Sequence, residues 1–545
     1  MKKIHPLILA GSSGLLLYAA WPVLPFTFLI FFAFIPLLWL EQQSTRGAKF
    51  FGWTYLTMLI WNVATTWWVC NSTLIGGMAA MLANSLLMCL PWICFYHIKR
   101  ALGPKFGYPS LLFFWLSFEY IHLNWELSWP WLTVGNVFAT HPGWVQWYEF
   151  TGCSGGSLWV LLMNLTVFLL LRAAFNGGDG KRGATRTPPG RLGRSVTRYA
   201  LYALLVLAGP IIFSRLLATN IEEQTTATDQ ATPNVIIVQP TLDPYNEKCV
   251  DSTQEGQLAR MISLSESQID LHTALIVWPE TAVPKDINED EMKLHPFMAP
   301  IWAMLSRHPG LSLLTGVEGF RVYPEQDKTP TSIKVPGTDL YEDSYNSAAL
   351  LDSHGIRIYH KSRLVPGVET LPSFLRFMRP LFEKFGGTGS GYAGQEERTV
   401  LHSANGGYHI APAVCYESIY GEFLSAYIRN GADLIAVITN DGWWGNTAGY
   451  KQHENYARLR AIEDRRWVVR SANTGISCFI DPAGRVIDPQ PWDKVAVIKM
   501  PVPPNKGLTL YARYGDILFK LALPCSILVV IWGVFVTFKR RLSHG

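Results

Sequence analysis

Long apolar runs fill both ends of the chain, and a segment of mixed polarity separates them. A helix needs about 20 mostly apolar residues to cross the hydrocarbon core of a bilayer. Eight runs approach this length, at residues 5–21, 23–40, 50–70, 77–97, 108–123, 155–173, 199–218 and 517–538. The pattern therefore predicts a transmembrane domain over residues 1–218 with seven helices. An eighth helix at 517–538 follows the mixed segment, and a short tail at 539–545 ends the chain.

In the segment of mixed polarity, the apolar runs differ in length and spacing from the long runs at the two ends. Its apolar runs are short, rich in β-branched residues and bounded by turn residues, as strands are. They lie at residues 235–238, 274–278, 311–315, 348–351, 409–414, 434–439, 467–470 and 477–480. Helical patterns alternate with them at 257–269, 296–307, 419–429 and 455–466. This alternation predicts a layered α/β domain over residues 233–500, between linkers at 219–232 and 501–516.

Lys and Arg gather in every second loop. They lie at residues 2–3, 46–49, 99–105, 181–198 and 539–541, whereas the loops at 71–76 and 124–154 contain neither. Basic loops stay in the cytoplasm, so we expect both termini there and the α/β domain outside. The first apolar run could also be a signal peptide, but it shows no small-residue cleavage site, and we expect a retained helix. Glu119, inside the fifth run, is costly in lipid, and we expect it to face protein or a polar cavity.

Composition changes this interpretation little. Charged residues make up 16% of the chain, against about 25% in soluble proteins. The net charge of +5 belongs to the basic loops, although the tract at 174–198 could also be interpreted as RNA-binding. None of the eight cysteines stands in a CxxC or Cys/His cluster, and no nucleotide motif is present. We expect neither metal nor cofactor. The sequence leaves open whether Cys249 and Cys478 are free.

Three groups with chemical potential each follow a predicted strand. Cys415 lies in Ala413-Val414-Cys415-Tyr416-Glu417, before a helical pattern whose positive end would favour a thiolate. Glu280 ends Val277-Trp278-Pro279-Glu280 and could act as a general base. Lys361 ends Tyr359-His360-Lys361 and could stabilise an oxyanion. Taken singly, they are better explained as a buried thiol, a solvated glutamate and a surface lysine. Their shared place at strand ends favours one pocket for acyl transfer through a thioester.

These segments resemble the three signature segments of the nitrilase superfamily. Residues 440–445, Asn-Asp-Gly-Trp-Trp-Gly, and Gln452-His453 are similar to its membrane-bound branch, the apolipoprotein N-acyltransferases. The resemblance covers essentially the whole chain and implies an αββα sandwich outside the membrane. It also implies a catalytic triad, which maps here to Glu280, Lys361 and Cys415.

The resemblance implies further site residues. Glu369 and Glu417 would support the triad, and the Tyr416 backbone N–H would bind the oxyanion. The family's run after the lysine is closer to Val-Pro-Phe-Gly-Glu, whereas Pro366 is followed here by Gly367-Val368. Substrate-binding candidates are Trp443, Trp444 and Tyr245, the last being the nearest aromatic to the family's gating tryptophan.

The implied activity is an N-acylation in the bacterial inner membrane. The donor would be a phospholipid such as phosphatidylethanolamine, and the acceptor the N-terminal S-diacylglyceryl-cysteine of a diacylated apolipoprotein. No nucleic acid would take part, and the α/β domain would be periplasmic. Two alternatives remain at this stage. The same triad would serve a membrane-tethered amidohydrolase, in which water replaces the amine. A transport or binding protein for lipids or lipoproteins would need no reactive thiol.

Overall fold

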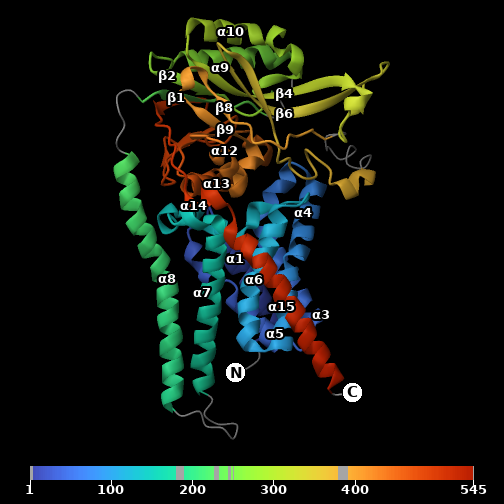
Figure 1. Ribbon diagram of the computed structural model, residues 1–545, viewed down its shortest axis with the longest axis vertical. Helices are drawn as coiled ribbons and strands as arrows, with labels where there is room; N and C mark the ends of the chain where they lie inside the picture. The colour runs from blue at the N-terminus through green and yellow to red at the C-terminus, as the bar shows by residue number, and fades with distance from the viewer. Residues whose placement is uncertain are drawn as a thin grey trace. The chain divides into compact units, whose positions relative to one another are not determined.

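The computed structural model describes residues 4–178, 189–225, 232–243, 247–248, 251–378 and 391–543 (Figure 1). The chain forms two compact units. The helical unit comprises Met1–Trp67, Met78–Ala218 and Asp516–Gly545. The α/β unit comprises Thr219–Gly515 together with Trp68–Gly77, a short segment from the N-terminal half of the chain.

Apolar helices occupy all eight regions in which the sequence predicts a span. They are α1 (Pro6–Ala20), η1 (Thr27–Phe31) with α2 (Ile35–Gln43), α3 (Gly47–Thr66), α4 (Leu74–Leu87) with α5 (Cys89–Leu102), α6 (Pro104–Leu123), α7 (Tyr148–Gly178), α8 (Pro189–Thr225) and α15 (Ile517–Leu542). Among the described residues, four stretches are long and apolar enough to cross a membrane, at Leu74–Leu102, Tyr148–Phe175, Ser195–Thr219 and Ile517–Leu542. The helices at Pro6–Ala20 and Thr27–Gln43 are shorter, and the count of eight spans stays a prediction.

The expectation for Glu119 is confirmed, because its side chain is buried in protein. One carboxylate oxygen, Oε1, accepts hydrogen bonds from the Trp115 indole N–H at 2.9 Å and from the Val134 backbone N–H at 2.7 Å. Val134 begins the short helix η4 (Val134–Thr140). A buried carboxylate must have such donors, and here they fix the loop after α6 to α6 itself.

Two sheets build the α/β unit. The first has the order β14-β1-β2-β4-β6-β5, with β3 beside β4 and β7 beside β6. Its strands are β1 (Asn234–Gln239), β2 (Thr273–Val277), β3 (Val283–Asn288), β4 (Ser312–Pro324), β5 (Ile333–Lys334), β6 (Leu340–Asp352), β7 (Gly355–His360) and β14 (Ala496–Pro501). The second has the order β13-β12-β11-β10-β9-β8. Its strands are β8 (Leu401–His402), β9 (His409–Val414), β10 (Leu434–Thr439), β11 (Val468–Ala472), β12 (Cys478–Ile480) and β13 (Val486–Ile487).

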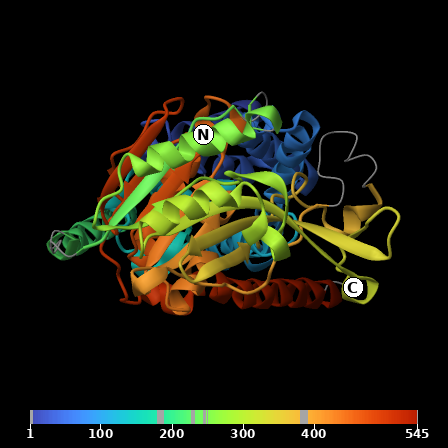
Figure 2. The ribbon, with the colours of Figure 1, turned by 90° about the horizontal axis from the view of Figure 1, so that it is seen from above.

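The two sheets face each other between two layers of helices. β1 and β11 are in contact across the middle, where the Ser471 hydroxyl donates to the Val238 carbonyl at 2.8 Å. Helices α9 (Gln254–Glu266) and α10 (Met298–Arg307) cover the outer face of the first sheet, as the view from above shows (Figure 2). Helices α12 (Gly421–Arg429) and α13 (Ala448–Asp464) pack on the second. This four-layer order agrees with the α/β prediction.

An apolar core fixes the first sheet to its helices. Ile236 and Ile276 from the strands share one buried cluster with Met261 of α9 and Ile301 of α10. Strands that are covered on both faces are nearly continuous apolar runs. In the second sheet, β9 and β10 are buried in this way, and both have the bounds that the sequence predicts.

The long hairpin of β4 and β6 differs from the sequence-based expectation, which placed strands only at 311–315 and 348–351. Pairing continues from Leu313 opposite Leu351 to Pro324 opposite Leu340. The outer part of β4 is only partly buried. Backbone hydrogen bonds extend this ladder, so an apolar pattern could not reveal it.

Candidate active site

Two of the predicted triad residues meet in a buried ion pair. Glu280 lies just beyond β2 and Lys361 directly after β7. The Lys361 ammonium Nζ lies 3.3 Å from Glu280 Oε1 and 2.7 Å from Glu369 Oε1. All three side chains are buried. Glu369, expected only as a supporting residue, makes the closer contact with the lysine.

The two carboxylates keep Lys361 charged. Burial alone would lower the pKa of a lysine, but the charges of Glu369 and Glu280 outweigh it and raise the pKa of Lys361 above its ordinary value. The side chain is therefore a fixed cation in a site that excludes water. Such a cation can stabilise negative charge that develops on a substrate oxygen.

Glu280 is oriented by two donors besides the lysine. The Asn346 side-chain amide donates to its Oε1 at 2.8 Å, and the Asn440 backbone N–H donates to its Oε2 at 3.0 Å. Asn346 also donates to Glu369 at 3.2 Å, so one amide connects both carboxylates. Sequence analysis missed Asn346. Its one signal is a polar side chain in β6 just before the apolar run at 348–351.

Cys415 stands at the turn between β9 and the short helix η11 (Cys415–Ile419). Its φ of 53° lies in the left-handed region, which side chains with a Cβ seldom adopt. A strained backbone at this point is typical of functional sites. The predicted strand-to-helix position is therefore present, although η11, and not α12, follows directly.

The buried surroundings of Cys415 oppose the thiolate that a helix N-terminus would favour. Burial raises the pKa of the Cys415 thiol above its ordinary value, and the charge of Glu280 raises it further, whereas Lys361 acts in the lowering direction. Glu280, Lys361 and Glu369 together carry a net negative charge, which disfavours a thiolate beside them. These surroundings therefore favour the thiol form of Cys415, and attack by its sulfur would need a base.

Glu417 connects the nucleophile strand to the lysine loop. Its Oε1 accepts from the Tyr359 hydroxyl at 2.6 Å and from the Ser362 N–H at 2.7 Å, and its Oε2 accepts from the Val414 N–H at 2.9 Å. Burial raises the pKa of Glu417, while these hydrogen bonds lower it. Its contacts make it a support that fixes the residues before Cys415 and after Lys361.

A second buried charge cluster lies behind Cys415, and sequence analysis did not find it. His453 of α13 places Nε2 at 3.1 Å from the Cys415 carbonyl and Nδ1 at 2.9 Å from Asp441. Arg470 of β11 donates to the other Asp441 oxygen at 2.7 Å. All three side chains are fully buried. The Gln452-His453 pair entered the sequence analysis only as part of a motif.

The remaining candidates have different surroundings. Tyr416 is buried, with its ring edge-on to Tyr420 at 5.3 Å between centroids. Trp444 packs between the rings of Trp68 and His453, at centroid distances of 4.8 and 5.5 Å. Trp443 is 36% exposed.

Tyr245 and Cys249 lie outside the described residues, whereas Cys478 is a buried free thiol. Within the described part of the chain, no group of three or more His, Cys, Asp or Glu side chains is placed to hold a metal ion.

This arrangement brings together a thiol, carboxylates and a buried cation, which are groups that acyl transfer can use. Residues 235–506 match the family model described as carbon-nitrogen hydrolase. The class is therefore a carbon-nitrogen hydrolase domain joined to an apolar helical unit. Residues 13–166 match the model of the apolipoprotein N-acyltransferase N-terminal domain.

Curated relatives define the family more narrowly. The apolipoprotein N-acyltransferase of Chlorobaculum tepidum is 32% identical, covering 94% of this chain and 93% of its own. Those of Geobacter metallireducens and Azotobacter vinelandii are 29% and 28% identical, covering 98% and 93% of this chain and 96% and 90% of their own. The chain belongs to the apolipoprotein N-acyltransferase family. It is a membrane protein and an acyltransferase, which favours neither the amidohydrolase nor the transport alternative.

Proposed function

We propose that this acyltransferase moves an acyl chain from a phospholipid to the α-amine of the N-terminal S-diacylglyceryl-cysteine of an apolipoprotein. Family membership supports N-acylation of lipoproteins. The observation that carries the covalent route is the Glu280–Lys361–Glu369 cluster, whose charges act on the Cys415 thiol. A protonated thiol beside an oriented carboxylate is arranged for base-assisted attack.

The first step forms a thioester. Glu280 takes the proton of Cys415 while the sulfur attacks the ester carbonyl carbon of the phospholipid. Lys361 and the Tyr416 N–H bind the oxyanion, a contribution of about 3–4 kcal/mol per donor in comparable sites. When the intermediate collapses, the ester C–O bond breaks and Glu280 returns the proton to the leaving alkoxide. A lysophospholipid departs, and the acyl chain remains on Cys415.

The second step transfers the chain to nitrogen. The neutral α-amine attacks the thioester carbonyl and gives a proton to Glu280. The C–S bond then breaks, and Glu280 returns that proton to the Cys415 sulfur. The amide product and the resting thiol are thereby restored together. Because the first product leaves before the acceptor reacts, the order is ping-pong.

The reaction site is proposed to face the periplasm from the inner membrane. The alternation of basic and non-basic loops supports this orientation. ATP and acyl-CoA are absent from that compartment, so a phospholipid such as phosphatidylethanolamine is the proposed donor.

Intact-mass measurement tests the thioester directly. The purified chain is incubated with phosphatidylethanolamine in the absence of an acceptor, and we expect one added acyl chain on Cys415. Cys415→Ala should gain none. Addition of a diacylated lipopeptide should discharge the chain and yield the N-acylated peptide.

Two results would contradict this proposal. If Cys415→Ala still acylates the lipopeptide, the thioester route is wrong. If the wild-type adduct hydrolyses as fast without acceptor as it disappears with acceptor, water is the natural acceptor and the amidohydrolase alternative holds.

A further inference from the structure

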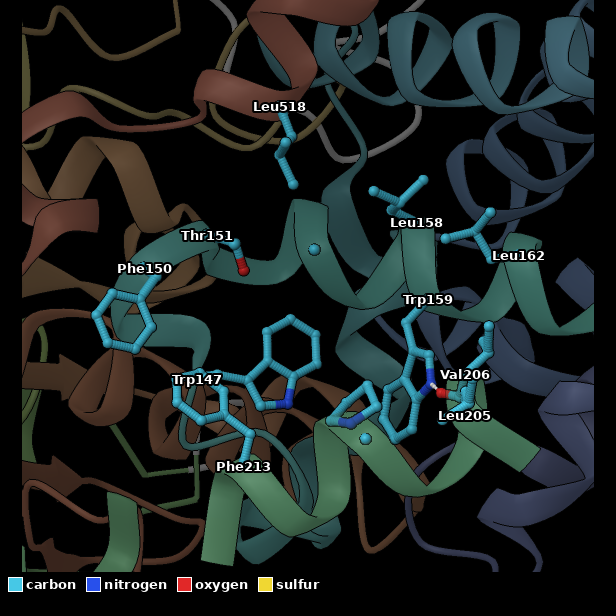
Figure 3. Close-up of a pocket in the computed structure, with 13 residues that line it drawn as sticks. Trp147, Phe150, Thr151, Leu158, Trp159, Leu162, Leu205, Val206, Phe213 and Leu518 are labelled. Carbon is cyan, nitrogen blue, oxygen red and sulfur yellow. Dashed lines mark hydrogen bonds between the residues drawn. The ribbon is translucent and has the colours of Figure 1, made fainter. Parts of the chain in front are cut away.

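An apolar cleft of about 660 Å³ lies inside the helical unit, between α7 and α8 (Figure 3). One face comes from α7, with Trp147 just before the helix and Trp159 and Leu162 along it. The other face comes from α8, with Leu205 and Phe213, and Leu518 of α15 lies at the edge. This volume is in the range of about 300–1,000 Å³ typical of small-ligand pockets.

Pro210 accounts for a hydrogen bond that joins α8 to α7 beside the cleft. Proline has no backbone N–H, so the carbonyl of Val206, four residues earlier, loses its helical donor. In a membrane that carbonyl needs another partner. The Trp159 indole N–H supplies it at 2.6 Å, as the dashed line in Figure 3 shows. This bond ties α8 to α7 at one level of the cleft.

A second tie holds α8 to the segment before α7. The Ser214 hydroxyl accepts from the Gln146 N–H at 2.7 Å and donates to the Gly143 carbonyl at 2.9 Å. Val206 and Ser214 are eight residues apart, which is about 12 Å along a helix. These bonds hold α8 at two levels, one on each side of the space along the helix. Gly209 lies between these ties, and a Cβ there would meet no atom within 4 Å.

The lining determines what the cleft can hold. Thr151 is its one lining residue with a side-chain hydroxyl, and that hydroxyl donates to the Gly152 carbonyl at 3.1 Å. The Trp147 and Trp159 indole N–H groups also have partners. Ordered water needs about two to four polar partners, so water does not suit this space. Both helices contain stretches that are long and apolar enough to cross a membrane, and only 6% of the α8 stretch is buried in the protein. The hydrocarbon part of a lipid is the occupant that fits such a lining.

We propose that this cleft binds one acyl chain of a membrane phospholipid as a defined site, distinct from bulk lipid contact. The chain lies along α7 and α8 across Gly209, with its length parallel to the helices. The site does not depend on the thioester chemistry proposed for Cys415, and it makes no use of that cysteine.

Lipid retention tests the site. The full chain is purified in mild detergent with added phosphatidylethanolamine, and bound lipid is counted by native mass spectrometry. Wild type should keep one tightly held lipid. Gly209→Leu places a side chain into the open space and should reduce its occupancy about tenfold, because several buried methylenes are displaced. Gly52→Leu in α3 is the matched control, since a Cβ at Gly52 also meets no atom within 4 Å, and it should bind like wild type.

A second measurement needs no variant. A phosphatidylethanolamine carrying a photoreactive group at the end of one chain is crosslinked to the wild-type protein, and the labelled peptides are mapped. Labels should concentrate on residues 147–162 and 205–213. Equal lipid retention by Gly209→Leu and wild type, or labels spread evenly over the apolar helices, would overturn the proposal and indicate bulk lipid alone.

Discussion

Two carboxylates contact the single Lys361 ammonium, with Nζ at 3.3 Å from Glu280 Oε1 and at 2.7 Å from Glu369 Oε1. A lysine beside one carboxylate would leave a neutral pair next to the nucleophile. The second carboxylate makes the cluster negative, so in the proposed mechanism Cys415 keeps its proton until Glu280 takes it. In the same mechanism Lys361 stays a cation and stabilises the oxyanion. Proton transfer from Cys415 to Glu280 leaves the total charge of the site unchanged.

The raised pKa of Cys415 predicts how the thiol reacts with iodoacetamide. Below its pKa, the thiolate fraction grows about tenfold per pH unit. Alkylation of the peptide that contains Cys415, followed by mass spectrometry, should therefore keep accelerating from pH 7 to pH 9. Lys361→Met removes a charge that lowers the pKa, and it should slow the reaction throughout. A rate that levels off below pH 8 would show a thiolate at rest.

His453 is predicted to position Cys415. Its Nε2 contacts the Cys415 carbonyl and the Ser418 hydroxyl at 3.1 and 2.9 Å. His453→Gln can present an amide N–H near the Nε2 position, whereas His453→Asn is too short to reach it. We expect kcat near wild type for the glutamine variant and a fall of up to about 100-fold for the asparagine variant. The KM for lipid should change little in either.

Equal losses of kcat in these two His453 variants would contradict a positioning role. Thermal unfolding of both serves as the control, because a purely structural defect would lower the melting temperature and kcat together. The glutamine variant should recover kcat even where its melting temperature is reduced.

At the scale of elements, β4 and the turn after β2 approach unusually closely. A Cβ on Gly316 of β4 would lie 2.3 Å from the Thr281 nitrogen and 2.6 Å from the Glu280 Cα. Thr281 also has a positive φ of 48°. This glycine therefore allows the turn that presents Glu280 to lie against the strand. The position of Glu280 therefore depends on Gly316 having no side chain.

Gly316→Ala should displace Glu280. Since the clashing atoms belong to backbone, we expect thioester formation to fall by about 100-fold and stability to fall by about 1–3 kcal/mol. Gly256→Ala in α9 is the control, because a Cβ there meets no atom within 4 Å, and it should leave activity unchanged. Single-turnover acylation and thermal unfolding measure the two effects. Wild-type acylation by Gly316→Ala would contradict the argument.

Local pattern predicts the elements better than it predicts the site. The apolar runs that became β9 and β10 have the predicted bounds, because both strands are buried on both faces. Three strand ends also bring Glu280, Lys361 and Cys415 into one region, as their positions suggested. In contrast, Asp441, His453 and Arg470 meet only because η12 (Asp441–Trp444), α13 and β11 fold together. No spacing in the sequence encodes that contact. The Asn346 bridge depends in the same way on the pairing of β4 with β6.

At the scale of the whole molecule, the proposed orientation in the membrane predicts which loops face the cytoplasm and which face the periplasm. Thr45 lies in an exposed loop between α2 and α3, and Gln326 is exposed in η8 (Glu325–Asp327) of the α/β unit. In cells with a permeable outer membrane, a membrane-impermeant maleimide should label Gln326→Cys and spare Thr45→Cys. After lysis it should label both. The unsubstituted chain controls for its own cysteines, and the reverse labelling pattern would invert the proposed orientation.

The α/β unit includes a short segment, Trp68–Gly77, that is distant from the rest of the unit in the sequence. Trp68–Gly77 belongs to this unit although it connects α3 to α4. Trp68 packs on Trp444, and the Asn71 amide donates to the Trp444 carbonyl at 2.8 Å. The Trp68 ring lies directly over Gly449. A Cβ on that residue would be only 2.7 Å from the ring, so the close packing requires glycine. A fragment limited to residues 235–506, the carbon-nitrogen hydrolase match, would lack the Trp68–Gly77 segment. Any attempt to crystallise or screen the catalytic part alone must therefore restore residues 68–77, for example as a fused or added peptide.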